Sequence, residues 1–380
     1  MSYPSLFIAL VLTSTVVAAA PPLQPDDRIA PPAAWPVFRG NASGSGIAAS
    51  QLPAQPELLW TFQAEDSFFE ATAAIVDSTV YVGDADKTFY AIDLATGKPR
   101  WTYPVEIGFL ASAAVADGRV FVGDSDGIFY CLDAATGKLH WKLTTEAEIN
   151  SSANFYEDSV LFGSQDGTLY RLKRDDGTPI WKYTIVAAGG IQSSPTLADN
   201  RAFFCGCDGQ LHVINVDTGK PVDSLEIGDP TLATPAIRGD HVYFGTEGGR
   251  QFAINWRQNK VSWTYEHPQR RLSYRSSAAV TATAVVVGGR NKLVEALAID
   301  TGKPLWEFAA RNRVDSSPVV SGDRVFVGSS DGRLYALDLA SGNEVWRYDA
   351  GAGFTASPAV AAGRLVIGND DGVLYCFGKK

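Results

Sequence analysis

The stretch SSPVVSGDRVFVGSSDGRLYALDLASGNEVWRYDA, residues 316–350, contains the pattern that decides the fold. Within it, four short runs rich in Val, Tyr and Phe are separated by the turn sequences SGD, DG and ASGNE. Such runs, bounded by Gly, Asp and Ser, predict four β-strands joined by tight turns. After the first twenty residues, no stretch of a dozen residues has a 3.6-residue apolar period. The body of the chain is therefore predicted to be all-β.

The same unit recurs about every 40 residues. A triplet of small residues marks the start of each unit, as in Ala71-Thr72-Ala73, and a tryptophan marks the end of all but one unit, where Asp223 replaces it. Units of four antiparallel strands at this spacing are typical of propeller blades. The sequence therefore predicts an eight-bladed β-propeller with four-stranded blades. The tryptophans expected to pack between blades are Trp60, Trp101, Trp141, Trp181, Trp263, Trp306 and Trp346.

The two ends of the repeat region complete each other. The last unit ends at VLYCFGKK, residues 373–380, which supplies a third strand but no fourth strand with a tryptophan. The run ELLWTF, residues 57–62, is a lone strand of the fourth type. Because an unclosed ring would expose sheet edges, we predict that residues 57–62 complete the last blade. The predicted propeller spans residues 57–380.

The residues before the repeats predict export. The apolar run from Leu6 to Ala20 ends in three alanines before Pro21, which is typical of a signal peptide covering residues 1–20. An uncleaved anchor is the alternative, although a spanning helix needs about 20 apolar residues. Residues 21–56 form a Pro-rich leader and an opening segment, and six prolines between Pro21 and Pro36 favour a stiff, extended spacer. After signal removal we expect no transmembrane segment and a periplasmic or secreted protein.

The composition limits the class of partner. The chain has 380 residues, of which 46% are hydrophobic and 19% charged, as in globular proteins. Its formal net charge of −10 argues against nucleic acid as a partner. The four His residues fall on different blades without the spacing of metal ligands, so no metal site is predicted. We expect a monomer that binds a protein.

The turn before each tryptophan carries a family resemblance. The segment AIDLATGKPRW, from Ala91 to Trp101, has the pattern A-x-D-x-x-T-G-x-x-x-W, and related segments recur across residues 57–380. The pattern resembles the tryptophan-docking repeat of the quinoprotein (PQQ) propeller family, which includes eight-bladed alcohol dehydrogenases and the outer-membrane assembly factor BamB. This resemblance implies that each Trp wedges between blades after a Thr-Gly turn. The opening WPVFRGNASGSG, residues 35–46, resembles that of exported bacterial members and implies a periplasmic setting.

The resemblance does not extend to the cysteines of the dehydrogenases. In those enzymes two adjacent cysteines form a disulfide over the quinone. Here Gly206 separates Cys205 from Cys207, so this feature is not carried over.

Two sets of candidate binding residues lie on the face that carries the loops between blades. The first is a basic group that could bind an acidic partner or an anion, and solvated surface charge is the alternative. The basic group consists of Arg270, Arg271, Arg275, Arg290, Lys292, Arg311 and Arg313. The second set precedes the small-residue triplets and could rim the central channel, with a water-filled funnel as the alternative. The candidate rim residues are Glu70, Asn150, Gln192, Arg275, Asp315 and Thr355.

Three functions are compatible with these features. The first is a non-catalytic scaffold that binds a protein in the cell envelope, similar to BamB and without a cofactor. The second is a dehydrogenase of alcohols or sugars that uses PQQ and Ca²⁺, as the resemblance would also allow. The third is a propeller that senses or carries a small ligand. Blades of about 40 residues leave no long insertions with which to enclose a cofactor, which favours the scaffold and no catalytic residues.

Overall fold

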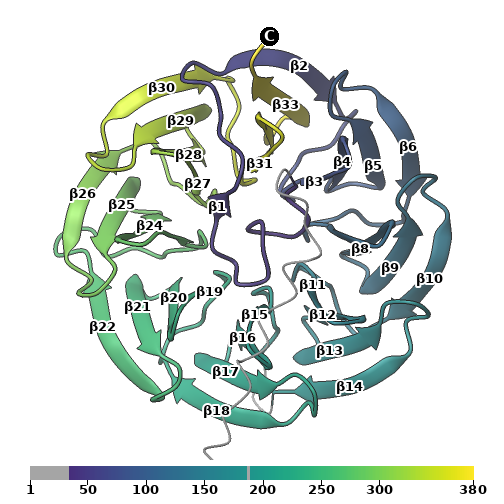
Figure 1. Ribbon diagram of the computed structural model, residues 1–380, viewed down its shortest axis with the longest axis horizontal. Coiled ribbons are helices and arrows are strands. Elements are labelled where there is room, and N and C mark those ends of the chain that lie inside the picture. The colour runs from purple at the N-terminus through teal and green to yellow at the C-terminus, as the bar shows by residue number, and fades with distance from the viewer. Residues whose placement is uncertain (1–33, 186–188) are drawn as a thin grey trace, which may run out of the picture.

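The computed structural model describes residues 34–185 and 189–380. The predicted signal peptide, residues 1–20, and the first part of the Pro-rich leader lie outside the described residues. Among the residues described, none forms a helix long and apolar enough to cross a membrane. The eight sheets stand around a common axis, so the predicted eight-bladed propeller is confirmed (Figure 1).

Each blade is a four-stranded antiparallel sheet, and strands are numbered in chain order. The innermost strands are β3 (Ala74–Val76), β7 (Ala114–Ala116), β11 (Asn154–Tyr156), β15 (Thr196–Ala198), β19 (Ala236–Arg238), β23 (Ala279–Val280), β27 (Val319–Ser321) and β31 (Ala359–Ala361). The second strands are β4 (Thr79–Gly83), β8 (Arg119–Gly123), β12 (Ser159–Gly163), β16 (Arg201–Cys205), β20 (His241–Gly245), β24 (Ala284–Gly288), β28 (Arg324–Ser329) and β32 (Arg364–Gly368).

The outer half of each blade consists of the third and fourth strands. The third strands are β5 (Thr88–Asp93), β9 (Ile128–Asp133), β13 (Thr168–Lys173), β17 (Gln210–Asn215), β21 (Arg250–Asn255), β25 (Leu293–Ala298), β29 (Arg333–Asp338) and β33 (Val373–Gly378). The fourth strands are β6 (Pro99–Pro104), β10 (Leu139–Thr144), β14 (Pro179–Thr184), β18 (Pro221–Glu226), β22 (Lys260–Glu266), β26 (Pro304–Ala309), β30 (Glu344–Asp349) and β2 (Glu57–Gln63). Blade one contains β3–β6, and blade eight contains β31–β33 and β2.

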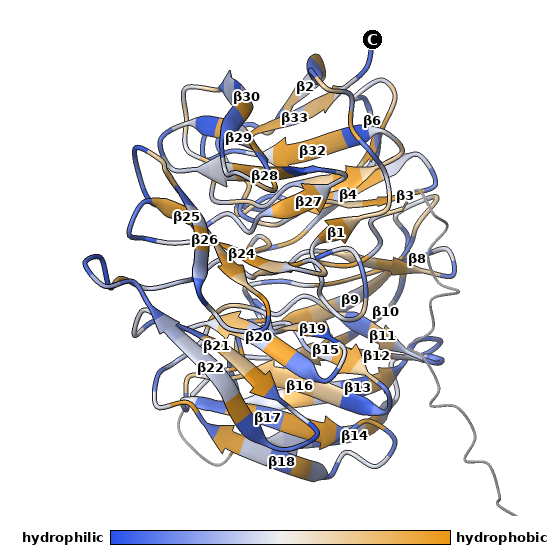
Figure 2. Ribbon diagram, turned by 60° about the vertical axis from the view of Figure 1, so that its left-hand side comes forward, coloured by the Kyte–Doolittle hydropathy of each residue, from blue (hydrophilic) through white to orange (hydrophobic). Residues whose placement is uncertain are grey.

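The ring closes as predicted from the sequence. Strand β2 pairs antiparallel with β33, with Trp60 opposite Cys376 and Thr61 opposite Tyr375. The second and third strands are buried almost throughout because they face neighbouring blades on both sides, and they are accordingly rich in Val, Ile, Leu and Phe. In Figure 2 these strands form the hydrophobic interior of the blades, beneath more polar loops.

The tryptophans connect the outer edge of one blade to the next. The indole Nε1 of Trp60 donates to the carbonyl of Leu94 at 2.9 Å, and Gly97 lies against the ring of Trp60. A Cβ at Gly97 would lie 2.7 Å from that ring, and its φ of 71° also favours glycine. The Thr-Gly turn therefore leaves the space that the indole fills. Five further indoles donate in the same way, from Trp101 to Ala134, Trp141 to Arg174, Trp181 to Val216, Trp263 to Ile299 and Trp306 to Leu339.

The interface without this tryptophan is filled from the opposite side. Asp223 of blade four lies near Asn259 of blade five, 3.3 Å from its amide nitrogen. Trp256, on the turn after β21, is buried and packs edge-on against Phe203 of blade four at 5.4 Å between ring centroids. An aromatic side chain thus still fills this interface, although it belongs to the following blade.

The opening segment lies inside the ring, which the sequence did not predict. Figure 1 shows it in the middle of the propeller, and β1 (Ile47–Ala48) pairs in parallel with β27 as a fifth strand of that sheet. Carbonyl groups of this segment accept the inward-facing amides of six innermost strands. These amides belong to Ile75, Val115, Leu197, Ile237, Val280 and Val320. Blade three is joined through Asn154, whose side-chain amide donates to the carbonyl of Ala42 at 2.9 Å.

We predict that two glycine-to-alanine substitutions differ in cost because of the indole packing. Gly118→Ala affects a residue with φ of 68° and no neighbour within 4 Å of the new Cβ, so it should lower the free energy of unfolding by about 1 kcal/mol. Gly177→Ala has a similar φ but would place a Cβ 2.6 Å from Trp141, which adds roughly 1–3 kcal/mol of overpacking. Urea unfolding measures both, and equal losses would contradict the proposed role of Gly177.

Candidate functional site

A closed cycle of hydrogen bonds surrounds the propeller axis. In every blade the middle residue of the small-residue triplet is Ser or Thr, and its hydroxyl accepts the backbone amide of the equivalent residue in the preceding blade. We call these eight residues the hydroxyl belt. In ring order they are Thr72, Ser112, Ser152, Ser194, Thr234, Ser277, Ser317 and Ser357. Seven bonds measure 2.9–3.0 Å, and the last, from Ser357 back to Thr72, measures 3.3 Å.

The belt is the wall of an axial cavity of about 440 Å³. Phe38 of the opening segment also lines this cavity, and its neighbour Arg39 is buried between blades six and seven. All six candidate rim residues line the same cavity: Glu70, Asn150, Gln192, Arg275, Asp315 and Thr355. These residues lie together because each occupies the same position in its blade, directly before the small-residue triplet.

Opposite charges meet at the cavity. Arg275 forms a two-pronged ion pair with Glu247, with distances of 2.9 and 3.1 Å. Arg290 binds Asp315 in the same way, at 2.9 Å for both contacts, and Arg313 reaches Asp315 at 3.2 Å. Two guanidinium groups therefore share one carboxylate.

The pKa values of two acidic groups, Glu70 on the cavity and Asp370 near Glu70, are raised above their ordinary range. The pKa of Glu70 is raised by burial and by the nearby carboxylates of Asp370 and Asp315, against the opposing effect of Arg275 and Arg313. Burial also raises the pKa of Asp370. Ionisation of Glu70 at neutral pH therefore costs the folded state free energy.

The predicted basic group is divided between two places. Arg270, Arg271, Arg290 and Lys292 line a second pocket together with the exposed Leu272, whereas Arg275, Arg290 and Arg313 line the axial cavity. Arg311 lies on neither, and its backbone amide donates to Asp331. Arg271 contacts Glu266 at 3.3 Å, so ion pairs already neutralise part of the group.

The loop that carries Arg270, Arg271 and Leu272 follows β22 and projects from the ring (Figure 2). It is anchored at its start by His267, whose Nδ1 accepts the backbone amides of Gln269 at 3.2 Å and Arg270 at 2.9 Å. At its end, the hydroxyl of Tyr274 donates to Glu295 at 2.8 Å. We call residues 267–275 the basic loop.

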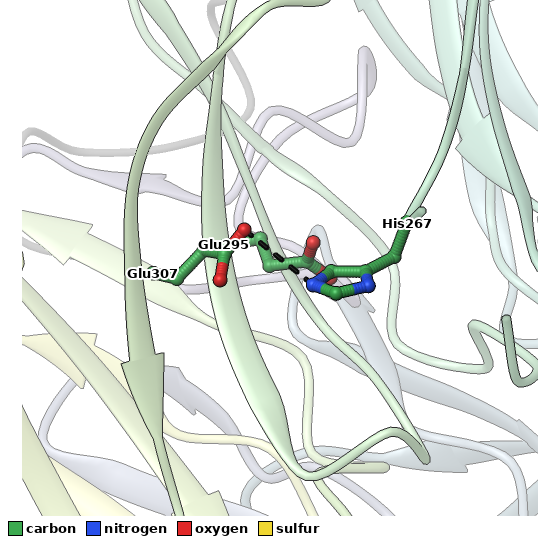
Figure 3. Close-up of side chains that lie close together, drawn as sticks. All are labelled: His267, Glu295 and Glu307. Atoms are coloured by element: carbon green, nitrogen blue, oxygen red, sulfur yellow. Dashed lines mark ion pairs between the residues drawn. The ribbon is translucent and has the colours of Figure 1, made fainter. Parts of the chain in front are cut away.

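His267, Glu295 and Glu307 bring their ligand atoms within 4.8 Å of one another (Figure 3). Because Nδ1 of His267 accepts two amide protons, the ring proton lies on Nε2, which is 3.5 Å from Glu307. A metal would need the lone pair that this proton occupies. The donor set therefore does not fit a metal, and Glu295, fully buried, instead accepts the hydroxyls of Tyr265 and Tyr274 and the side-chain amide of Asn291.

The residues present do not fit PQQ with Ca²⁺ either. A planar quinone needs flat apolar surfaces to pack on, and Phe38 is the one aromatic residue among the described residues that line the axial cavity. Ca²⁺ takes six to eight oxygen ligands, yet Asp315 is engaged by two arginines. Cys205 and Cys207 are free thiols, and burial raises the pKa of both.

Comparison with known proteins places residues 46–380, which form the blades, in one family. A family model described as outer membrane protein assembly factor BamB matches residues 46–202, 130–292 and 290–380. The chain belongs to the BamB family. Outer membrane protein assembly factor BamB of Shewanella oneidensis is 28% identical over 119 residues, which are 31% of this chain and 30% of that protein. The match thus spans less than a third of this BamB relative.

Solved structures show the same fold at low identity. BamB from Moraxella catarrhalis superimposes with a TM-score of 0.73 and 21% identity, covering 86% of this chain and 98% of that one. Quinohemoprotein alcohol dehydrogenase from Comamonas testosteroni gives a TM-score of 0.78 at 17% identity, covering 93% and 82%. At these identities the likeness shows the shared fold alone.

Several residues of the site were not found by sequence reasoning. Phe38 and Arg39 belong to a segment without repeats, so no periodicity marked them. Glu295 was hidden within an apolar strand, although a lone Glu in the sequence LVEALA could have signalled a buried polar group.

We predict that the belt hydroxyls stabilise the ring through the amides that they accept. Ser112→Ala leaves the buried Thr72 amide without an acceptor and should cost about 1–3 kcal/mol in unfolding free energy. Ser112→Thr keeps the hydroxyl, as Thr72 and Thr234 do naturally, and should cost less. Hydrogen exchange of the Thr72 amide should accelerate in the alanine variant alone. Unchanged exchange there would mean that the belt bond is not formed.

We predict that Glu70→Gln stabilises the protein in a pH-dependent way. Because the pKa of Glu70 is raised on folding, its ionised form opposes folding at neutral pH. The variant should therefore unfold at higher urea concentration at pH 7, and its advantage should shrink as the pH falls and wild-type Glu70 becomes protonated. Glu65→Gln, in the same loop but outside the axial cavity, is the control. A constant advantage at every pH would disprove the electrostatic origin.

Proposed function

We propose that this BamB-family protein is an exported, non-catalytic scaffold of the cell envelope, which binds a protein partner on its loop-bearing face. The observation that carries the proposal is the basic loop, which presents cations and an exposed apolar side chain on a fixed backbone. Leu272 is 53% exposed, and Arg270 and Lys292 form no ion pair among the described residues. An acidic segment with an apolar side chain has the complementary chemistry.

The rigidity of the basic loop supports this role. His267 fixes the first turn through two amides, and Tyr274 is buried against Glu295 at the other end. A loop that is already ordered loses little conformational entropy on binding, so more of the contact energy appears as affinity. Arginine is one of the residues enriched in binding hot spots, and the basic loop presents Arg270 and Arg271 beside Leu272.

Catalysis has less support. The blades carry no long insertions, and the axial cavity offers, among the described residues, one aromatic residue, Phe38, and one carboxylate outside an ion pair, Glu70, whereas PQQ with Ca²⁺ would need flat apolar surfaces and several oxygen ligands. A dehydrogenase therefore remains the weaker alternative, supported by the shared fold alone. The family description suggests that the partner belongs to outer-membrane protein assembly in the periplasm.

The proposal predicts a defect in outer-membrane protein levels. In cells that lack the gene, plasmid-borne wild-type protein should restore the amount of β-barrel proteins in isolated outer membranes. The double variant Arg270→Glu, Leu272→Ser should restore it poorly, because charge reversal repels an acidic partner and the apolar anchor is lost. Lys142→Glu, a charge reversal on the outer strand β10, is the matched control.

Photocrosslinking tests whether the basic loop is the binding surface, separately from the test of the assembly role. A photoreactive residue at position 272 should capture one defined envelope protein, whereas the same residue at the exposed Ile180 should not. If gene loss leaves outer-membrane protein levels unchanged, the assembly role is wrong. If levels fall but the double variant restores them fully, the role stands and the basic loop is not the binding surface.

A further inference from the structure

The hydroxyl belt has unused hydrogen-bonding capacity. Each of its eight hydroxyls accepts one backbone amide, and a hydroxyl also has one proton to donate. Within the described part of the chain, none of the eight donates to a protein atom. All eight line the axial cavity, so they present a ring of O–H donors there.

Positive charge adjoins this ring of donors. Arg39 is 1% exposed, donates through Nη2 to the carbonyls of Ala278 and Pro318, and has no described partner for Nε or Nη1. These two carbonyls belong to the residues that follow Ser277 and Ser317 of the belt. Burial lowers the pKa of Arg39 to about 9, so it is still charged at neutral pH. An unpaired guanidinium in such a position is costly unless a negative charge lies near.

Arg313 also lines the cavity and has N–H donors that bind no other described residue. Arg313 contacts Asp315 and Ser330 through Nε, and neither of its Nη atoms has a hydrogen-bond partner among the described residues. Asp315 is already bound by Arg290, so one carboxylate serves two guanidinium groups. The walls of the cavity therefore offer donors and a surplus of positive charge on one side.

We propose that the axial cavity binds a small oxyanion, a carboxylate or phosphate group, whose oxygens accept hydrogen bonds from the belt hydroxyls and from Arg313. The volume of about 440 Å³ is within the range of small-molecule sites. Three arginines but only two carboxylates, Glu70 and Asp315, line the cavity, and oxyanions pair strongly with both guanidinium and hydroxyl donors. This site adjoins the basic loop, which contributes Arg275 to the cavity rim, whereas Arg270 and Leu272, proposed to contact the protein partner, do not line the cavity.

Glu70 opposes the anion. It lines the same cavity and its charge interacts with Arg313 and Arg275. Its negative charge should weaken binding, so removal of Glu70 and removal of Arg313 have opposite predicted effects. General damage to the fold would weaken binding in both variants, and therefore cannot reproduce this pattern.

Titration calorimetry at low ionic strength tests the proposal with the purified protein. Inorganic phosphate, sulfate and malonate are titrated separately, which distinguishes a phosphate-type from a carboxylate ligand, and chloride is the non-oxyanion control. We expect saturable binding of at least one oxyanion. Arg313→Gln should weaken its affinity about tenfold, because a charge-assisted bond is lost, and Glu70→Gln should strengthen it.

The matched control is Lys142→Gln, which removes one positive charge from the exposed side of β10. Its affinity should equal that of the wild type. The proposal is overturned if no oxyanion binds saturably, or if Arg313→Gln and Lys142→Gln behave alike. It is also overturned if Glu70→Gln leaves the affinity unchanged, since the anion would then lie outside the axial cavity.

Discussion

The hydrogen bond from a backbone amide in one blade to a Ser or Thr hydroxyl in the next is the interaction on which the ring depends. Side-chain packing between neighbouring blades sets distance but little direction, and other hydrogen bonds join only particular pairs of blades, as from Tyr81 to Ala134 and from Arg119 to Arg174. The belt bond fixes both distance and direction, since a hydroxyl accepts along a preferred angle. Because the cycle returns from Ser357 to Thr72, a shift of one blade disturbs its neighbours on both sides.

Outside the belt, the kind of contact between blades changes with distance from the propeller axis. Apolar and aromatic side chains of the second and third strands fill the middle, and the indoles with their glycine turns hold the outer edge. The opening segment adds a second closure at the axis, independent of the pairing of β2 with β33. Its carbonyls satisfy amides of innermost strands that have no strand partner on that side, so the small axial radius does not leave buried donors unpaired.

Repetition determines how much could be predicted from the sequence. The blade count, the closing strand and the six rim residues of the cavity follow from positions that recur in each unit, so one correct alignment places all of them. Features that occur once were missed for the same reason. Three such features depend on contacts between distant segments: the path of residues 35–48, the filling of the blade four–five interface by Trp256 where Asp223 replaces the repeat tryptophan, and the burial of Arg39. The basic group illustrates a related limit, because pairing of Arg275 with Glu247 and of Arg290 with Asp315 is not visible along the chain.

Nearly identical blades present nearly identical surfaces around the ring. A partner can therefore select one sector only through residues that depart from the repeat. These departures concentrate in blades four to six, where Asp223 replaces the Trp, Gln258-Asn259 replaces the Thr-Gly turn, Ala298 replaces the Asp and the basic loop extends beyond the body. The symmetric belt tolerates them because it uses backbone amides and a single hydroxyl per blade, which do not depend on loop sequence. The buried Glu295 with its two tyrosines then holds the altered sector in one conformation. Symmetry at the axis thus permits asymmetry at the loops, and the asymmetric sector is where binding specificity can arise.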